Sequence, residues 1–194
     1  MLRKTIKNIA LLDLQNFTAE ALREIKKIES CAMLLVPKNA SDEWKNAYAK
    51  IIIRNVASII EVSYSKYSVL NGMVTLNDKN VSDDCLYIVN GIVILETVEK
   101  IPDLCVNGLL LKRKKSRYEM TRMNGRSVEV EDNVVIKPYP NTIEIDSDTV
   151  RSFDYNTLVA AGNNVDIDNN VTEQMLSDKK ITFAAGNEVK CGKS

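Results

Sequence analysis

Residues 87–94 read Tyr-Ile-Val-Asn-Gly-Ile-Val-Ile, two short apolar runs joined by one Asn-Gly dipeptide. The same dipeptide occurs four times in this part of the chain, in steps of 19, 17 and 17 residues, and an apolar or β-prone run follows each copy. Self-similarity at such a period is typical of stacked repeat proteins, in which each repeat buries its apolar face against the next. The asparagines that share this phase are Asn55, Asn71, Asn90, Asn107, Asn124, Asn141 and Asn156.

Two structures account for an Asn-Gly dipeptide between apolar runs. In a β-hairpin it forms the tight turn, because both residues accept positive φ. In a β-solenoid it forms a corner, and the asparagine side chain bonds to its equivalent in the next coil. The continuous apolar runs favour the solenoid, since buried parallel strands need not alternate apolar and polar residues. Near the end of the chain, the phrase Ala-Ala-Gly-Asn at residues 160–163 recurs at residues 184–187.

The first 62 residues follow a longer pattern that alternates strands with helices. Strands are expected at residues 8–14, 31–36 and 51–62. Between them, Thr18 is a good N-cap for a helix that runs to about residue 28, and Ser41 is a good N-cap for a second, shorter helix. This order of elements predicts parallel strands in repeats of about 22–25 residues.

The predicted fold is mainly β with N-terminal α/β units. We expect a single-stranded β-solenoid of the right-handed type, with coils of about 15–25 residues. Residues 1–62 are expected to be strand–helix capping units continuous with the solenoid coils of residues 63–194, so that the chain forms one structural domain overall.

Two family resemblances accompany this pattern. Leu11, Leu14 and Phe17, spaced by three, resemble the strand motif of leucine-rich repeat proteins. The coils from about residue 55 to residue 190 resemble β-helical proteins in general, of which the polymer-forming bactofilins are one example. The resemblance lies in repeat length and strand pattern, and it implies a stacked scaffold rather than a particular chemistry.

Composition excludes several classes of function. Lys plus Arg and Asp plus Glu each total 26, so the chain lacks the basic surplus that nucleic acids and anionic membranes favour. The absence of histidine excludes Ser-His-Asp machinery and histidine-ligated metals. The sequence has neither a signal-peptide pattern nor an apolar run long enough for a membrane helix, so a cytoplasmic location is expected. The four cysteines are widely spaced, which favours reduced thiols over disulfides or a zinc site.

Two charged segments are the candidate surfaces. Residues 112–126 hold seven basic residues and one acidic residue, whereas residues 127–178 hold eleven acidic and two basic residues. Such runs are either solvated loops and strand faces or surfaces that orient an association. The possible interaction patch consists of Lys112, Arg113, Lys114, Lys115 and Arg117. The possible acidic face consists of Glu144, Asp146, Asp148, Asp166 and Asp168.

These observations predict a non-enzymatic structural or protein-interaction module, with no catalytic residue, cofactor or metal. Its expected partner is a second copy of the chain, possibly in a dimer, or another protein, and neither a membrane nor a nucleic acid. The alternative is a carbohydrate-binding or carbohydrate-cleaving β-helix protein, because glycan cleavage uses two carboxylates at a set separation. Aromatic side chains beside acids in a groove would favour the alternative, and a broad patch or an uncovered terminal coil would favour the module.

Overall fold

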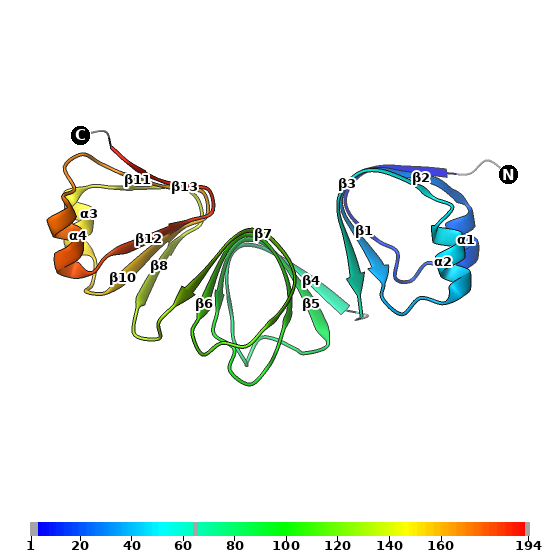
Figure 1. The fold of residues 1–194 in the computed structure, drawn as a ribbon, viewed down its shortest axis with the longest axis horizontal. Coiled ribbons are helices and arrows are strands. Elements are labelled where there is room, and N and C mark those ends of the chain that lie inside the picture. The colour runs from blue at the N-terminus through cyan, green and yellow to red at the C-terminus, as the bar shows by residue number, and fades with distance from the viewer. Residues whose placement is uncertain (1–3, 64–65, 193–194) are drawn as a thin grey trace. The chain divides into compact units, whose positions relative to one another are not determined.

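The fold is mainly β, as the sequence predicts: strands make up 55% of the chain and helices 13%. The computed structural model describes residues 4–63 and 66–192, and within these ranges each strand pairing is parallel. The chain divides into two units, Met1–Ser65 and Lys66–Ser194, which are described separately (Figure 1). In the described ranges, no helix has both the length and the apolar character needed to cross a membrane.

The first unit is a three-stranded sheet with two short helices between its strands. The strands are β1 (Lys4–Asp13), β2 (Ile25–Pro37) and β3 (Ile52–Val62), in that order across the sheet. Helix α1 (Ala19–Arg23) connects β1 to β2, and α2 (Asp42–Tyr48) connects β2 to β3. The helices lie on the side opposite the bend of the strands, and their apolar side chains join the core of the unit (Figure 1). That core includes Leu14, Leu22, Ile28, Leu34 and Trp44.

All three strands of this sheet bend at one level. Asn8, Ser30 and Asn55 have φ values of 59°, 55° and 51°, and the pairing of their flanking residues places them opposite one another. Asparagine tolerates this left-handed conformation better than most residues, whereas serine adopts it rarely. The bend at each position turns the strand around the core, so these three residues set the curvature of the unit.

The first helix is shorter than the sequence pattern predicts. It ends at Arg23 rather than near residue 28, and Ile25 and Ile28 belong to β2. Both isoleucines are buried, at 4% and 0% exposure, and both lie in register with β1. The prediction was wrong because the register shifts between Lys4 and Thr5, which gives β2 one extra residue after Ile25. A spacing of three then places both isoleucines on the core side of a strand.

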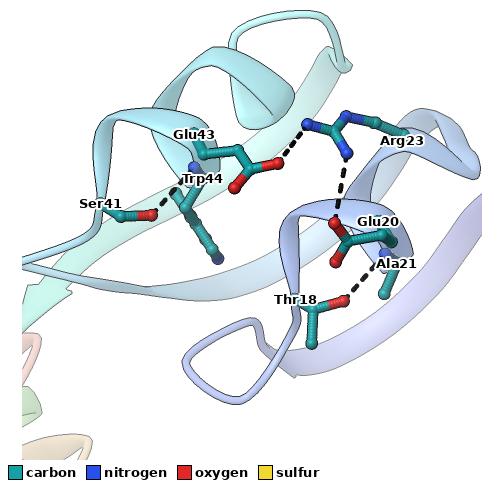
Figure 2. A network of polar contacts seen from close by, with 7 residues as sticks. All are labelled: Thr18, Glu20, Ala21, Arg23, Ser41, Glu43 and Trp44. Atoms are coloured by element: carbon teal, nitrogen blue, oxygen red, sulfur yellow. Dashed lines mark hydrogen bonds and ion pairs between the residues drawn. The ribbon is translucent and has the colours of Figure 1, made fainter.

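The two helices are capped as predicted and are joined by one arginine. The hydroxyl oxygens of Thr18 and Ser41 each accept a hydrogen bond, at 3.2 Å, from a backbone N–H in the first turn of the following helix (Figure 2). The guanidinium of Arg23 donates to Glu20 at 3.3 Å and to Glu43 of the neighbouring helix at 2.7 Å. Equivalent helices of successive repeats are thereby held side by side.

The second unit begins with a four-stranded sheet that contains the Asn-Gly dipeptides. Its strands, in order, are β4 (Lys66–Leu76), β5 (Cys85–Leu95), β6 (Asp103–Arg113) and β7 (Glu119–Val130). Each Asn-Gly lies inside a continuous strand, opposite the Asn-Gly of the next strand. The hairpin alternative is therefore wrong, because a hairpin turn would join antiparallel strands.

Each of these strands is folded at its Asn-Gly so that its two arms share one core. Val89 and Val93, which flank the bend of β5, are both fully buried in the same apolar cluster. Ile92, on the opposite face of the second arm, belongs to another cluster that includes Leu158 and Ala160 from further along the chain. The second arms of β5 and β6 are consequently covered on both faces, which explains their continuous apolar sequence.

The rest of the second unit consists of two three-stranded sheets and two helices. In one sheet the order is β12 (Thr182–Ala185), β10 (Thr157–Ala161), β8 (Val135–Tyr139). In the other it is β13 (Glu188–Cys191), β11 (Asn164–Ile167), β9 (Ile143–Ile145). Helices α3 (Ser147–Ser152) and α4 (Glu173–Lys179) each lead from the second sheet back to the first. Apolar side chains from both sheets and from α3 form one core between them.

The glycines of the bends are predicted to differ in their tolerance of a side chain. A Cβ on Gly108, at φ 136°, would lie 2.2 Å from the Gly91 oxygen, whereas a Cβ on Gly72, at φ 85°, would meet nothing within 4 Å. Gly108→Ala should lower the free energy of unfolding by on the order of 3 kcal/mol, and Gly72→Ala by about 1–2 kcal/mol from backbone strain alone. Urea denaturation followed by far-ultraviolet circular dichroism measures both, and equal losses would contradict the close approach.

Candidate functional site

A ladder of side-chain amides runs across the four-stranded sheet. The Nδ2 of Asn90 donates to Oδ1 of Asn71 at 2.9 Å, and the Nδ2 of Asn107 donates to Oδ1 of Asn90 at 2.8 Å. Asn124 lies in register with Asn107, but its side chain makes no hydrogen bond to another described residue. In-register parallel strands place identical side chains at the strand spacing, which allows amides to bond in a chain. We call these four residues the asparagine ladder.

The structure brings together four of the seven predicted ladder positions, and it places the other three elsewhere. Asn55 belongs to the bend of the first unit. Asn141 lies at the corner between β8 and β9, where its carbonyl accepts a backbone hydrogen bond from Asn163 at 3.2 Å. Asn156, at φ 60°, precedes β10, and its side chain donates to the Asn133 carbonyl at 3.1 Å. After β7 the repeats become longer because they contain the helices α3 and α4. Asparagines spaced evenly along the sequence therefore do not all lie opposite one another in the structure.

The corner column of the last sheets consists of Asn141, Asn163 and Asn187, of which only Asn141 was predicted as a ladder position. Asn187 donates its backbone N–H to the Asn163 carbonyl at 2.8 Å, continuing the bond from Asn163 to Asn141. A Cβ on Gly162 would lie 2.2 Å from the Pro140 oxygen, so only glycine allows this approach. The recurring Ala-Ala-Gly-Asn phrase was the sequence signal for this column.

A hollow of about 410 Å³ lies between the asparagine ladder and this corner column. Its lining offers amide donors, amide acceptors and backbone groups, and no lining residue is charged or aromatic. Such a lining is chemically suited to hydrogen bonds with neutral polar groups, and it supplies no nucleophile or acid–base pair. The lining residues that come from both sides include Asn90, Asn107, Asn124, Gly162, Asn163 and Asn187.

The basic run predicted as an interaction patch is paired with acids of the following repeat. Lys112 lies 3.1 Å from Glu129, Lys114 lies 2.8 Å from Glu131, and Lys115 lies 3.8 Å from Asp132. Each pair spans 17 residues, which is the step between β6 and β7, so the pairing of the strands neutralises much of the charge separation seen along the sequence. Each exposed pair contributes about 0–1 kcal/mol.

The other two basic residues of the run differ from each other. Arg113 lies 3.6 Å from Glu96 on one side and donates to the carbonyls of Glu131 and Val134 on the other, at 2.9 and 2.8 Å. Arg117 is exposed. Arg113 therefore links three successive repeats.

The five predicted acidic residues do not form one face. Glu144 and Asp166 lie in register on β9 and β11, followed by Lys190 on β13. Asp168 accepts a hydrogen bond at 3.1 Å from the backbone N–H of Asn170, within a turn. Among the residues that the structure describes, no group of three or more Cys, Asp or Glu side chains is arranged to hold a metal ion.

The remaining two acids of that set belong to the start of α3. Asp146 is its N-cap and accepts a hydrogen bond from the backbone N–H of Thr149 at 2.7 Å. Hydrogen bonding from Thr149 holds the pKa of the Asp146 carboxyl below its ordinary value. Asp148 forms an ion pair with Arg151 at 2.7 Å. Both carboxylates stabilise the helix end.

The four cysteines are free thiols that differ in exposure. Cys31 and Cys105 are buried, Cys85 is half-buried and Cys191 is exposed. Burial raises the pKa of the Cys85 and Cys105 thiols, which keeps them protonated and weakly nucleophilic at neutral pH.

An aspartate clamp, which the sequence analysis missed, holds successive loops together. The Asp78 carboxylate accepts hydrogen bonds from the backbone N–H groups of Val98, Glu99 and Lys100, at 3.1, 3.2 and 3.0 Å. Asp83 accepts one more hydrogen bond, at 2.9 Å, from the backbone N–H of Ile101. Hydrogen bonds to these backbone groups, that of Lys100 foremost, hold the pKa of the Asp78 carboxyl below its ordinary value. The clamp fixes the entry to β6 against the loop that precedes β5.

The bonds of the asparagine ladder predict a graded response to alanine. Asn90→Ala removes both side-chain hydrogen bonds of the ladder and should lower the free energy of unfolding by about 1 kcal/mol, since the amide is exposed and water replaces part of each bond. Asn124→Ala removes none and should change it by less than about 0.5 kcal/mol. Urea denaturation of the two variants compares them, and an equal loss from both would show that the ladder bonds do not contribute.

The aspartate clamp predicts a dependence of stability on pH. Because the pKa of Asp78 is lower in the folded than in the unfolded chain, its stabilisation is complete above the unfolded pKa and is lost as the pH falls through the folded pKa. Asp78→Asn should therefore be less stable than the parent protein at neutral pH, and the gap should close under acid conditions. Urea denaturation at a series of pH values measures the gap, with Asp83→Asn as the single-bond control. A gap that stays constant with pH would contradict the assignment.

No protein-family model matches the sequence, and no curated protein or solved structure is significantly similar to it. The function of the chain is accordingly inferred from its own structure, in particular from the outer strands of its sheets.

Proposed function

We propose that the chain is a right-handed β-solenoid that serves as a non-enzymatic structural module and associates with a second copy of itself. The solenoid is supported by the order of the strands, since those of each sheet follow one another along the chain and pair in parallel and in register. Crossovers between parallel strands of one sheet are right-handed in about 98% of cases. The four free cysteines fit a reducing compartment such as the cytoplasm.

The observation that carries the functional proposal is the character of β4, an outer strand of the four-stranded sheet. Its side chains Tyr67, Val69 and Met73 are 37%, 44% and 48% exposed. It contains no proline, and its one charged residue is Lys66, at its start. Natural proteins normally protect an outer strand with charges or proline, so an apolar and unprotected one is suited to pairing with another strand.

Two other outer strands of this unit, β7 and β8, provide a contrast. β7, at the far side of the same sheet, carries four charged residues, Glu119, Arg122, Arg126 and Glu129. β8, an outer strand of the next sheet, contains Pro138, which has no N–H to offer a partner. β4 therefore lacks the protection that these two strands have.

A second copy of the chain is the partner that this surface fits. Two β4 strands related by a two-fold axis would cover each other's exposed side chains and pair their free backbone groups in a closed dimer. Such a contact is apolar at its centre, so its strength should depend mainly on the side chains of β4 rather than on salt.

The proposal is tested by sedimentation equilibrium of the full chain with matched valine variants. Val69→Lys places a charge on the exposed face of β4 and should weaken self-association by about tenfold or more. Val135→Lys introduces the same change at a valine of similar exposure, 39%, on the proline-protected β8, and should leave association unchanged. A parent protein that stays monomeric at high micromolar concentration would overturn the proposal, as would equal weakening by both variants.

A further inference from the structure

We propose that Asn124 and Gly125 form a site of spontaneous deamidation, at which the asparagine loses its side-chain nitrogen as ammonia. The same dipeptide at Asn90 and Gly91 is protected by the asparagine ladder. The inference is independent of the proposed self-association. It concerns the one chemical reaction to which an Asn-Gly sequence is intrinsically prone, and the four copies in this sheet differ in how firmly they are held.

The reaction needs only water as a second reactant. The backbone nitrogen of the glycine attacks Cγ of the preceding asparagine, forming an N–Cγ bond, and the Cγ–Nδ2 bond breaks. The nitrogen's proton leaves with the amide as ammonia, and a five-membered cyclic imide remains. Water then adds to one of the two imide carbonyls and opens the ring to aspartate or isoaspartate. Glycine favours the attack because it has no Cβ to hinder it.

The ladder holds Asn90 at both ends of its side-chain amide. Its Nδ2 donates to Asn71 and its Oδ1 accepts from Asn107, at 2.9 and 2.8 Å. For Cγ of Asn90 to approach the Gly91 nitrogen, the side chain must rotate, and this rotation breaks both hydrogen bonds. The nitrogen that would leave as ammonia is also the Nδ2 that donates to Asn71. Asn107 is held through its nitrogen and Asn71 through its oxygen, so both are expected to react at intermediate rates.

Asn124 has no such restraint. Its side chain is exposed and bonds to no other described residue, and it lies on β7, which has a neighbouring strand on one side only. The glycines do not account for the difference, since Gly91 and Gly125 have similar φ values of 136° and 142° and each packs closely on the preceding glycine. Two features distinguish the sites: the bonding of the asparagine, and the position of β7 at the side of the sheet.

The product would alter the sheet at a defined place. Isoaspartate adds one carbon atom to the path of the backbone, so the residues of β7 after position 124 can no longer remain in register with β6. The first pair affected is Gly125 with Gly108, and the ion pair of Lys112 with Glu129 follows. Modification should therefore loosen the second arm of β7.

The test is peptide mapping by mass spectrometry of the full native chain, incubated at physiological temperature and pH and sampled over time. The rate of conversion at Asn124 should exceed that at Asn90 by about tenfold or more. In denaturant the two rates should converge, because both peptides then have the same Asn-Gly chemistry. A native Asn90 that converts as fast as Asn124 would overturn the proposal.

A variant tests the protecting bonds directly. Asn71→Ala combined with Asn107→Ala removes both bonding partners of Asn90 and leaves its own sequence context intact, so the Asn90 rate should rise toward that of Asn124. An unchanged Asn90 rate in a variant that keeps the circular dichroism of the parent would show that the ladder bonds do not protect it. Should the double variant not fold, Asn71 and Asn124 of the parent protein are compared, since both lie on outer strands and Asn71 is bonded to Asn90; equal rates would overturn the proposal.

Discussion

The approach of one glycine backbone to the next is the constraint on which the second unit depends. A Cβ on Gly91 would lie 2.0 Å from the Gly72 oxygen, and one on Gly125 would lie 1.9 Å from the Gly108 oxygen. No other residue type permits this distance, so the glycines fix which positions of neighbouring strands face each other. The asparagine ladder, the buried arms and the cross-strand ion pairs are all consequences of that fixed register.

The register also explains how a chain with segregated charge presents a balanced surface. The basic residues at and just beyond the end of β6 lie one repeat before the acidic residues at and just beyond the end of β7, and the pairing of the two strands brings them together. A run of like charge along the sequence therefore becomes a row of ion pairs across the sheet. The contribution of each pair to stability is small, but their common spacing opposes any slip of one strand past another.

The sequence was sufficient for the parts of the fold that local chemistry decides. The Asn-Gly repeat predicted the parallel strands, and Thr18 and Ser41 predicted the two helix starts. The sequence was insufficient where pairing with distant residues determines the secondary structure. Ile25, for example, was expected in a helix but belongs to β2. The aspartate clamp was missed because nothing in the residues around Asp78 indicates that three backbone N–H groups, some twenty residues later, will face it.

The order of strands in the four-stranded sheet also governs how it opens. β5 and β6 each have two neighbouring strands, whereas β4 and β7 each have one. Separating an outer strand breaks one interface and separating an inner strand breaks two, so the sheet frays from its sides rather than from its bends. Amide protons of β5 and β6 should thus exchange only when the whole sheet is lost, and a protease that needs an extended segment should find β7 or β4 first.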